Sequence, residues 1–127
     1  MRCRALLRRA LARPGYGGVL AYALPEALWL AGGDEPVSDD IVVAYPSADR
    51  AAIAALAAGE PAARAITLMV DSQEQLDLID SVVAADRRPS VRVCLDVDAS
   101  LRLLGGRVHV GTLRSPVRSA AEATELA

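Results

Sequence analysis

The sequence predicts an α/β fold in which parallel strands alternate with helices, and three observations support it. Short apolar runs recur about every 25 residues along the chain. Segments with helical periodicity and capping signals lie between these runs. The runs are continuously apolar, which is typical of strands buried on both faces of a parallel sheet. With 127 residues, 53% of them hydrophobic, the chain has the size of one domain.

The first half of the chain contains two helix–strand pairs. Leu7 and Leu11 lie on one face of the first helix, which ends at Pro14. Pro25 opens the second helix, and Glu26 lies in its first turn, where the helix dipole favours an acid. The expected elements are a helix over 3–12, a strand over 19–22, a helix over 25–31 and a strand over 41–44.

The second half continues the alternation, with clear helix caps. Asp49 can cap an Ala-rich helix, which Gly59 and Pro61 close. Residues 72–75 and 119–122 each have the spacing of a capping box. The expected elements are a helix over 50–58, a strand over 66–70, a helix from 73 that ends before Pro89, a strand over 91–97, a tight turn at 105–106, a strand over 107–110 and a final helix from 120.

Two architectures share this pattern. One is a doubly wound sheet of flavodoxin or response-regulator type. The other is part of an eightfold α/β barrel, whose full length is about 250 residues, so that the chain would form about half of the ring. A response regulator needs acids after its first strand and a late lysine, whereas Asp39 and Asp40 precede a strand and the chain has no lysine. No linker divides the chain, so we expect one domain over 1–127.

The basic residues exclude one kind of chemistry. All 14 are arginine, so the polypeptide has no lysine for an internal Schiff base. Five arginines precede the first acid, Glu26. Such a start can be a transit peptide or a nucleic-acid patch, but it lacks serine and interleaved aromatic residues. We interpret it as a solvated helix face and expect a cytoplasmic protein with Cys3 and Cys94 reduced.

Polar side chains at the carboxyl ends of the strands are the first candidates for a site, because ligands bind there in both architectures. Tyr22 and Tyr45 can line a pocket or simply keep a wet hydroxyl on an apolar ring. Asp71 precedes a capping serine and fits a turn. Asp96 and Asp98 would share one strand face and could hold a cation. However, Asp98 also begins a turn and no third ligand is evident, so we expect no metal site.

The remaining candidates are isolated in the sequence. His109 lies between valines without ligand or triad spacing, which favours a surface role. Cys94 fits a small buried hydrophobe, whereas Cys3 lies near arginines that can lower a thiol pKa. The glycines in 15–18 follow no strand, so they do not match a nucleotide-binding loop. Arg114 lies between a strand and a capped helix, where a guanidinium can bind a carboxylate or phosphate.

Five stretches in series resemble a known family. They are residues 2–7, 21–27, 40–46, 95–98 and 110–117, with the sequences RCRALL, AYALPEA, DIVVAYP, LDVD and VGTLRSPV. They are similar to the amino-acid deaminase/aldolase group related to D-threonine aldolase and D-serine dehydratase. The resemblance covers nearly the whole chain in the expected order. It implies an alanine-racemase-type N-terminal barrel of the fold-type III pyridoxal phosphate class, of which 1–127 would be a partial domain.

The resemblance also implies where a cofactor would lie. The family lysine that binds pyridoxal phosphate covalently would precede Met1 by a couple of residues. Arg114 matches the family arginine that reaches towards the cofactor ring or the lysine, and Tyr45 would line the pocket. We therefore assign Arg114 and Tyr45 to cofactor binding, and no catalytic or metal-binding residue to this chain. The connection from Asp98 to Arg114 is longer here than in the racemases, a departure that puts the arginine match in doubt.

These implications define the expected function. The family would cleave, dehydrate or deaminate D-amino acids with pyridoxal phosphate as electron sink. We expect this chain alone not to catalyse the reaction, because it has no lysine. Its partners would be a small amino acid and a second copy or complementing chain at the exposed sheet edges, without nucleic acid or membrane. The alternative is a self-sufficient, non-catalytic α/β module for binding or interaction.

Overall fold

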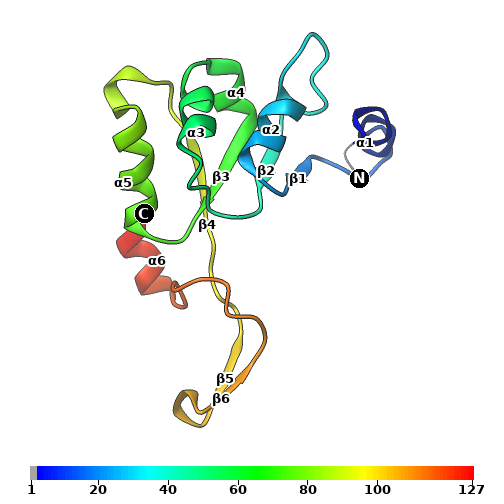
Figure 1. The fold of residues 1–127 in the computed structure, drawn as a ribbon. Coiled ribbons are helices and arrows are strands. Elements are labelled where there is room, and N and C mark those ends of the chain that lie inside the picture. Colours follow the sequence, from blue (N-terminus) through cyan, green and yellow to red (C-terminus); the bar gives the residue numbers. More distant parts are fainter. Residues whose placement is uncertain (1–2) are drawn as a thin grey trace.

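Four strands pair side by side in chain order in the computed structural model, which describes residues 3–127. They are β1 (Val19–Ala21), β2 (Ile41–Val43), β3 (Ile66–Val70) and β4 (Arg92–Leu95). All three pairings are parallel. The predicted alternation of parallel strands with helices is therefore confirmed (Figure 1). The sequential order β1-β2-β3-β4 differs from that of doubly wound sheets, in which the strand order reverses.

Helices connect the strands and flank the sheet. They are α1 (Arg4–Leu11), α2 (Leu24–Ala31), α3 (Arg50–Ala57), α4 (Glu60–Ala65), α5 (Gln73–Val82) and α6 (Ala120–Leu126), with short 3₁₀ turns η1 (Ala85–Arg87) and η2 (Leu104–Gly106). Two further strands, β5 (Leu101–Leu103) and β6 (Val108–Val110), form an antiparallel hairpin. No helix among residues 3–127 has the length and apolar character needed to cross a membrane.

Local sequence signals account for most helix starts. The Asp49 carboxylate accepts a hydrogen bond from the Ala52 amide at 3.0 Å and caps α3 as predicted. Ser119 accepts from the Glu122 amide at 3.2 Å, which confirms the second capping box. The first box is not formed, because the Ser72 side chain caps nothing at the start of α5.

One expected boundary is wrong, and two elements were not predicted. The helix expected over 50–58 ends at Ala57 with Ala58 as its C-cap, which confirms that boundary. The sequence did not predict α4, because Pro61, which favours a break, lies in its first turn, a position that needs no amide donor. The strand expected over 91–97 ends at Leu95, because its partner β3 ends at Val70, directly opposite. Strand β5 was not predicted, although Leu101 and Leu103 alternate with polar residues as strand residues do.

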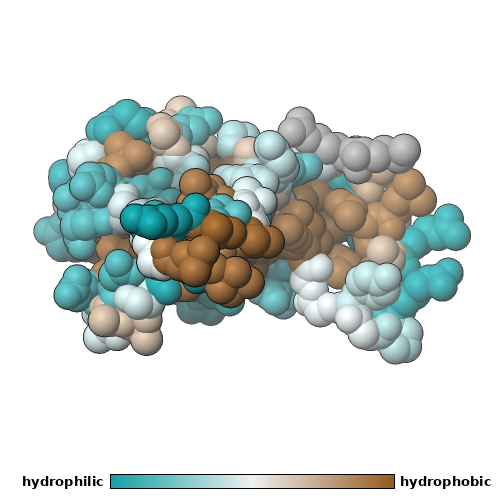
Figure 2. All heavy atoms as spheres, turned by 90° about the horizontal axis from the view of Figure 1, so that it is seen from below, coloured by the Kyte–Doolittle hydropathy of each residue, from teal (hydrophilic) through white to brown (hydrophobic). Residues whose placement is uncertain are grey.

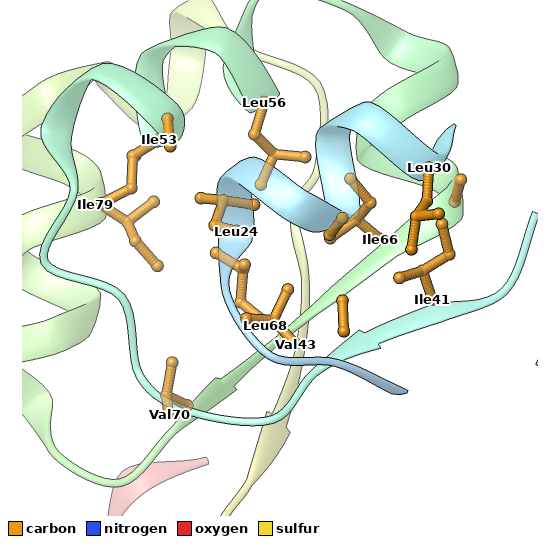
Figure 3. Packing of buried hydrophobic residues seen from close by; sticks show 14 of the residues in the cluster. Leu24, Leu30, Ile41, Val43, Ile53, Leu56, Ile66, Leu68, Val70 and Ile79 are labelled. Atoms are coloured by element: carbon orange, nitrogen blue, oxygen red, sulfur yellow. The ribbon is translucent and has the colours of Figure 1, made fainter. Parts of the chain in front are cut away.

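The hydrophobic core fills the space between one face of the sheet and the helices (Figure 3). Fully buried side chains from the helices meet fully buried side chains from the strands. Those of the helices are Leu24, Leu30, Ile53 and Leu56, and those of the strands include Ile41, Val43, Ile66 and Val70. Burying each of these side chains contributes about 1.5–3 kcal/mol. This layer holds the carboxyl ends of β1 to β4 in one row.

The opposite face of the sheet, which we call the open face, is also apolar. Side chains alternate across a strand, so the residues between the core positions point to this second face. Leu20 is 69% exposed there, whereas Met69 and Cys94 are half-buried and paired in register. Thr67 is buried, and its hydroxyl oxygen has no hydrogen-bond partner among the described residues. A sheet that simply faced water would carry polar residues at these positions.

Candidate functional site

Two tyrosines meet at the carboxyl edge of the sheet. Tyr22 follows β1 directly, and Tyr45 lies two residues beyond the end of β2. Their ring centroids are 5.1 Å apart at an interplanar angle of 61°, an edge-to-face contact. Both rings line a hollow of about 350 Å³, to which Pro25 and Asp49 also contribute. Both tyrosines therefore lie at the carboxyl edge, and of the two alternatives left by the sequence the hollow favours a pocket wall.

Arg114 reaches the same edge from the segment that follows the hairpin. Its guanidinium carbon lies 5.3 Å from the centroid of the Tyr45 ring, in cation–π geometry. Its Nη2 donates to the carbonyl oxygen of Ala44 at 3.4 Å, and its Nε lies 3.7 Å from Oδ2 of Asp96. The two residues that the resemblance assigns to cofactor binding are thus in contact, although they are far apart in the chain.

Buried hydrogen bonds fix the segment that carries Arg114. The hydroxyl of Ser115 donates to the Asp96 carbonyl oxygen at 2.6 Å and accepts from the Val117 amide at 3.0 Å. The Asp98 amide donates to the Val117 carbonyl oxygen at 2.8 Å. Ser115 and Val117 are both buried. The backbone that follows Arg114 is therefore tied to the residues that follow β4.

The predicted pair of carboxylates is not a pair in the structure. Because β4 ends at Leu95, Asp96 turns to Arg114, whereas Asp98 turns to the start of the hairpin. The Asp98 side chain is only 2% exposed and lies 3.7 Å from Arg102. Among residues 3–127, no three histidine, cysteine or acidic side chains lie close enough together to hold a metal ion. The expectation that a shared strand face joins these acids is wrong.

Asp98 instead organises a turn. Its Oδ1 accepts from the Ser100 amide at 3.0 Å, and hydrogen bonds from Ser100 lower the pKa of this carboxyl below its ordinary value. The nearby charges of Arg102 and His109 lower the pKa further. His109 has a partner of its own, because its Nε2 lies 2.8 Å from the Ser100 hydroxyl oxygen. The role of Asp98 in a turn agrees with the sequence prediction.

The other sequence candidates lie outside this cluster. Cys94 is half-buried on the open face, and its burial, followed by the negative charge of Asp96, raises the pKa of its thiol. Gly18 lies so close to the Asp40 carbonyl oxygen that a Cβ would approach it to 2.6 Å, which explains this glycine by packing. Sequence reasoning missed the ion pair between Asp96 and Arg114, because no local pattern links two residues on separate segments.

The geometry defines what this edge of the sheet can do. A partly exposed guanidinium, two phenols and one carboxylate can bind a planar or anionic group by hydrogen bonding and stacking. Comparison with known proteins adds no relative, since no family model, no curated protein and no solved structure matches the chain. The interpretation of the site therefore depends on its own geometry and on the motifs quoted above.

Proposed function

We propose that this chain forms an arc of an α/β barrel of the alanine-racemase type, similar to that of the D-threonine aldolase and D-serine dehydratase group. The sequential order of four parallel strands supports the proposal, because barrel strands follow one another in chain order. Both outer strands, β1 and β4, have an unpaired edge within the sheet. A second copy or a complementing chain can continue the sheet at these edges.

The open face gives the second line of support. The interior of an α/β barrel is filled by bulky side chains from the strands. Leu20, Val42 and Met69 are apolar at the positions that would point into such an interior. In this proposal, the hydroxyl of Thr67 gains a partner from side chains across the ring.

The observation that carries the functional proposal is the contact between Arg114 and Tyr45 at the carboxyl edge of the strands. Barrel active sites lie at this edge. The resemblance independently assigns these two residues to the cofactor pocket. In the proposed role, the Arg114 guanidinium donates hydrogen bonds to a bound cofactor, and the Tyr45 ring forms the wall that supports it.

Pyridoxal phosphate does not fit this chain as a covalently bound group. All 14 basic residues are arginine, so no side-chain amine can take the place of the family lysine. The residues at the edge suit one wall of a cofactor site, but none of them can form the covalent bond that the family lysine makes. We therefore assign no catalytic step to this chain and propose that it does not cleave or deaminate D-amino acids alone.

Titration with pyridoxal phosphate, followed by nuclear magnetic resonance, tests the proposal. We expect weak, reversible binding that shifts the signals of Tyr45 and Arg114, and an R114A variant that loses these shifts. The matched control is R118A, which removes an exposed arginine of the same segment. Borohydride should trap no adduct on an internal side chain, once reaction at the Met1 α-amine has been excluded by mapping. An internal adduct, or shifts that survive R114A, would overturn the proposal.

The second candidate is a self-sufficient, non-catalytic α/β module. The observation that favours it is the completeness of the core, in which Leu24, Ile41 and Ile66 are fully buried without any other chain. Such a module needs neither the cofactor contact nor a ring. The same titration separates the two candidates, because the module predicts no shift at Tyr45 or Arg114 at any concentration of pyridoxal phosphate.

A further inference from the structure

The hairpin of β5 and β6 is an arm that extends away from the sheet and its helices (Figure 1). In the antiparallel register, Leu101 lies opposite Val110 and Leu103 lies opposite Val108. Directly opposite residues share a face, so these four apolar side chains form one surface of the ribbon. All four are exposed or nearly so. In Figure 2 the molecule is seen from below, with the arm nearest the viewer, and hydrophobic atoms gather there.

The tip of the arm bears a strained apolar residue. Leu104 has a backbone φ of 54°, in the left-handed region that residues other than glycine and asparagine rarely adopt. Its side chain is 77% exposed and adds nothing to the core. The left-handed backbone belongs to the tight turn, in which the next residue, Gly105, also has a positive φ of 66°, while the side chain of Leu104 is left as free apolar surface at the tip.

The charge of the arm has one sign. Residues 99–121 contain four arginines and no acid. Two of the four are paired with acids at the base of the arm, Arg102 with Asp98 and Arg114 with Asp96. Arg107, near the tip, forms no ion pair with any residue that the structure describes. The arm is therefore both apolar and basic.

A groove of complementary character lies between the start of α5 and α6. Its volume is about 290 Å³, and its lining includes Asp71, Glu122 and Glu125 together with Val117 and Leu126. The lining contains no basic residue. Glu122 is already held by the cap of α6, whereas Asp71 and Glu125 form no ion pair within residues 3–127. The groove thus offers apolar surface and free negative charge.

We infer that the arm of one copy docks into the α5–α6 groove of a second copy, and that two copies exchange arms reciprocally. Leu104 enters the groove, and Arg107 pairs with the carboxylates on its rim. In Figure 1 the arm points away from α6 and the start of α5, the elements that line its own groove, so a partner must supply the contact. Two arms that paired directly with each other would bring like charges together, which disfavours that arrangement.

The area of such an exchange suits a dimer. Burying about half of each of five apolar side chains removes on the order of 400 Å² from water per arm, an exposed patch of the size that marks an interaction site. Two exchanged arms together remove roughly 800 Å² before the shallow grooves are counted, which lies in the range of weak, reversible association. This inference does not depend on the proposed cofactor contact, because the groove shares no lining residue with the hollow beside Tyr45.

Sedimentation equilibrium from micromolar to sub-millimolar concentration tests the inference. We expect a reversible monomer–dimer equilibrium that weakens with added salt, because charged groups are paired at the rim. R107E and E125R should each weaken association by about tenfold. The double variant R107E/E125R, in which the two charges are exchanged, should restore it. R50E, a charge reversal at an exposed arginine in the first turn of α3, is the matched control and should change nothing.

A second variant separates association from folding. L104G relieves the left-handed strain, so its monomer should be at least as stable as the wild type, while its dimer should be weaker. A protein that stays monomeric throughout the concentration range would overturn the inference. A dimer whose affinity is unchanged by both R107E and E125R would also overturn the inference. A monomer that binds vesicles of anionic phospholipid through the arm would replace the second copy by a lipid surface, and the inference would be wrong.

Discussion

Replacing Ser115 by alanine tests how the protein holds Arg114 at the edge of the sheet. Ser115 is only 6% exposed. Its hydroxyl donates to the Asp96 carbonyl oxygen and accepts from the Val117 amide. The alanine variant leaves both backbone groups without this partner in a buried setting. Leaving one such group unsatisfied costs about 1–3 kcal/mol, and partial access of water offsets some of the loss, so we expect S115A to lower the free energy of unfolding by about 2 kcal/mol.

Two measurements check this expectation. Urea unfolding gives the change in free energy, and its slope should stay constant because the surface exposed on unfolding is unchanged. The side-chain resonances of Arg114 report the second effect, since the Tyr45 ring shifts them only while the guanidinium lies over it. We expect S115A to lose this shift.

A matched serine supplies the control. The Ser81 hydroxyl donates to the Leu78 carbonyl oxygen from an exposed position on α5. S81A should stay within about 0.5 kcal/mol of the wild type, as surface substitutions usually do. If S115A is equally mild and Arg114 keeps its ring-current shift, the buried clamp does not position the arginine, and the reasoning is refuted.

Three further predictions follow from single groups. Hydrogen bonds from Ser100 lower the pKa of Asp98, so the ionised carboxylate stabilises the fold at pH values above its ordinary pKa of 3.8. This stabilisation is lost as the pH falls through the lowered pKa. The urea midpoint should therefore fall less steeply with acid pH for D98N than for the wild type. S119A should cost α6 about 1 kcal/mol and accelerate its amide hydrogen exchange, leaving the sheet unaffected. Since burial, and then the charge of Asp96, raise the pKa of Cys94, iodoacetamide should alkylate this thiol more slowly than free cysteine at equal pH, and urea should remove the difference.

The sequence predicts the sheet well because each strand is specified locally. Runs such as Ile41–Val43 and Ile66–Val70 are continuously apolar, and turn residues bound them. Where the prediction is wrong, a second influence acts on the same residues. Pro61 is a helix breaker inside a helix but a favourable residue in its first turn, and only the path of the chain decides between the two. The residue at which β4 ends depends on the length of its partner β3. The sequence of β4 alone carries no information on that length.

The site divides in the same way. The tyrosines could be placed at the carboxyl edge from sequence, since Tyr22 ends one predicted strand and Tyr45 directly follows the next. The contact between Arg114 and Tyr45 could be expected only from the resemblance, because several helices and strands separate the two along the chain. The ion pair with Asp96 had no signal at all. It arises because β4 ends early and frees Asp96 to turn towards the arginine.

Apolar surface without a partner within the chain occurs in two separate places, and this separation is why the two proposals can both hold. The open face presents Leu20 and Met69 towards what would be the interior of a ring. The arm, which carries Leu104 and Arg107, extends away from the sheet (Figure 1) and precedes Arg114 in the chain. A partner that continues the sheet at β1 or β4 covers the first surface and leaves the second free. Exchange of arms would cover the second, at a groove that shares no lining residue with the hollow beside Tyr45. The proposed dimer and the proposed barrel therefore make separate demands on one polypeptide, and each can be tested without the other.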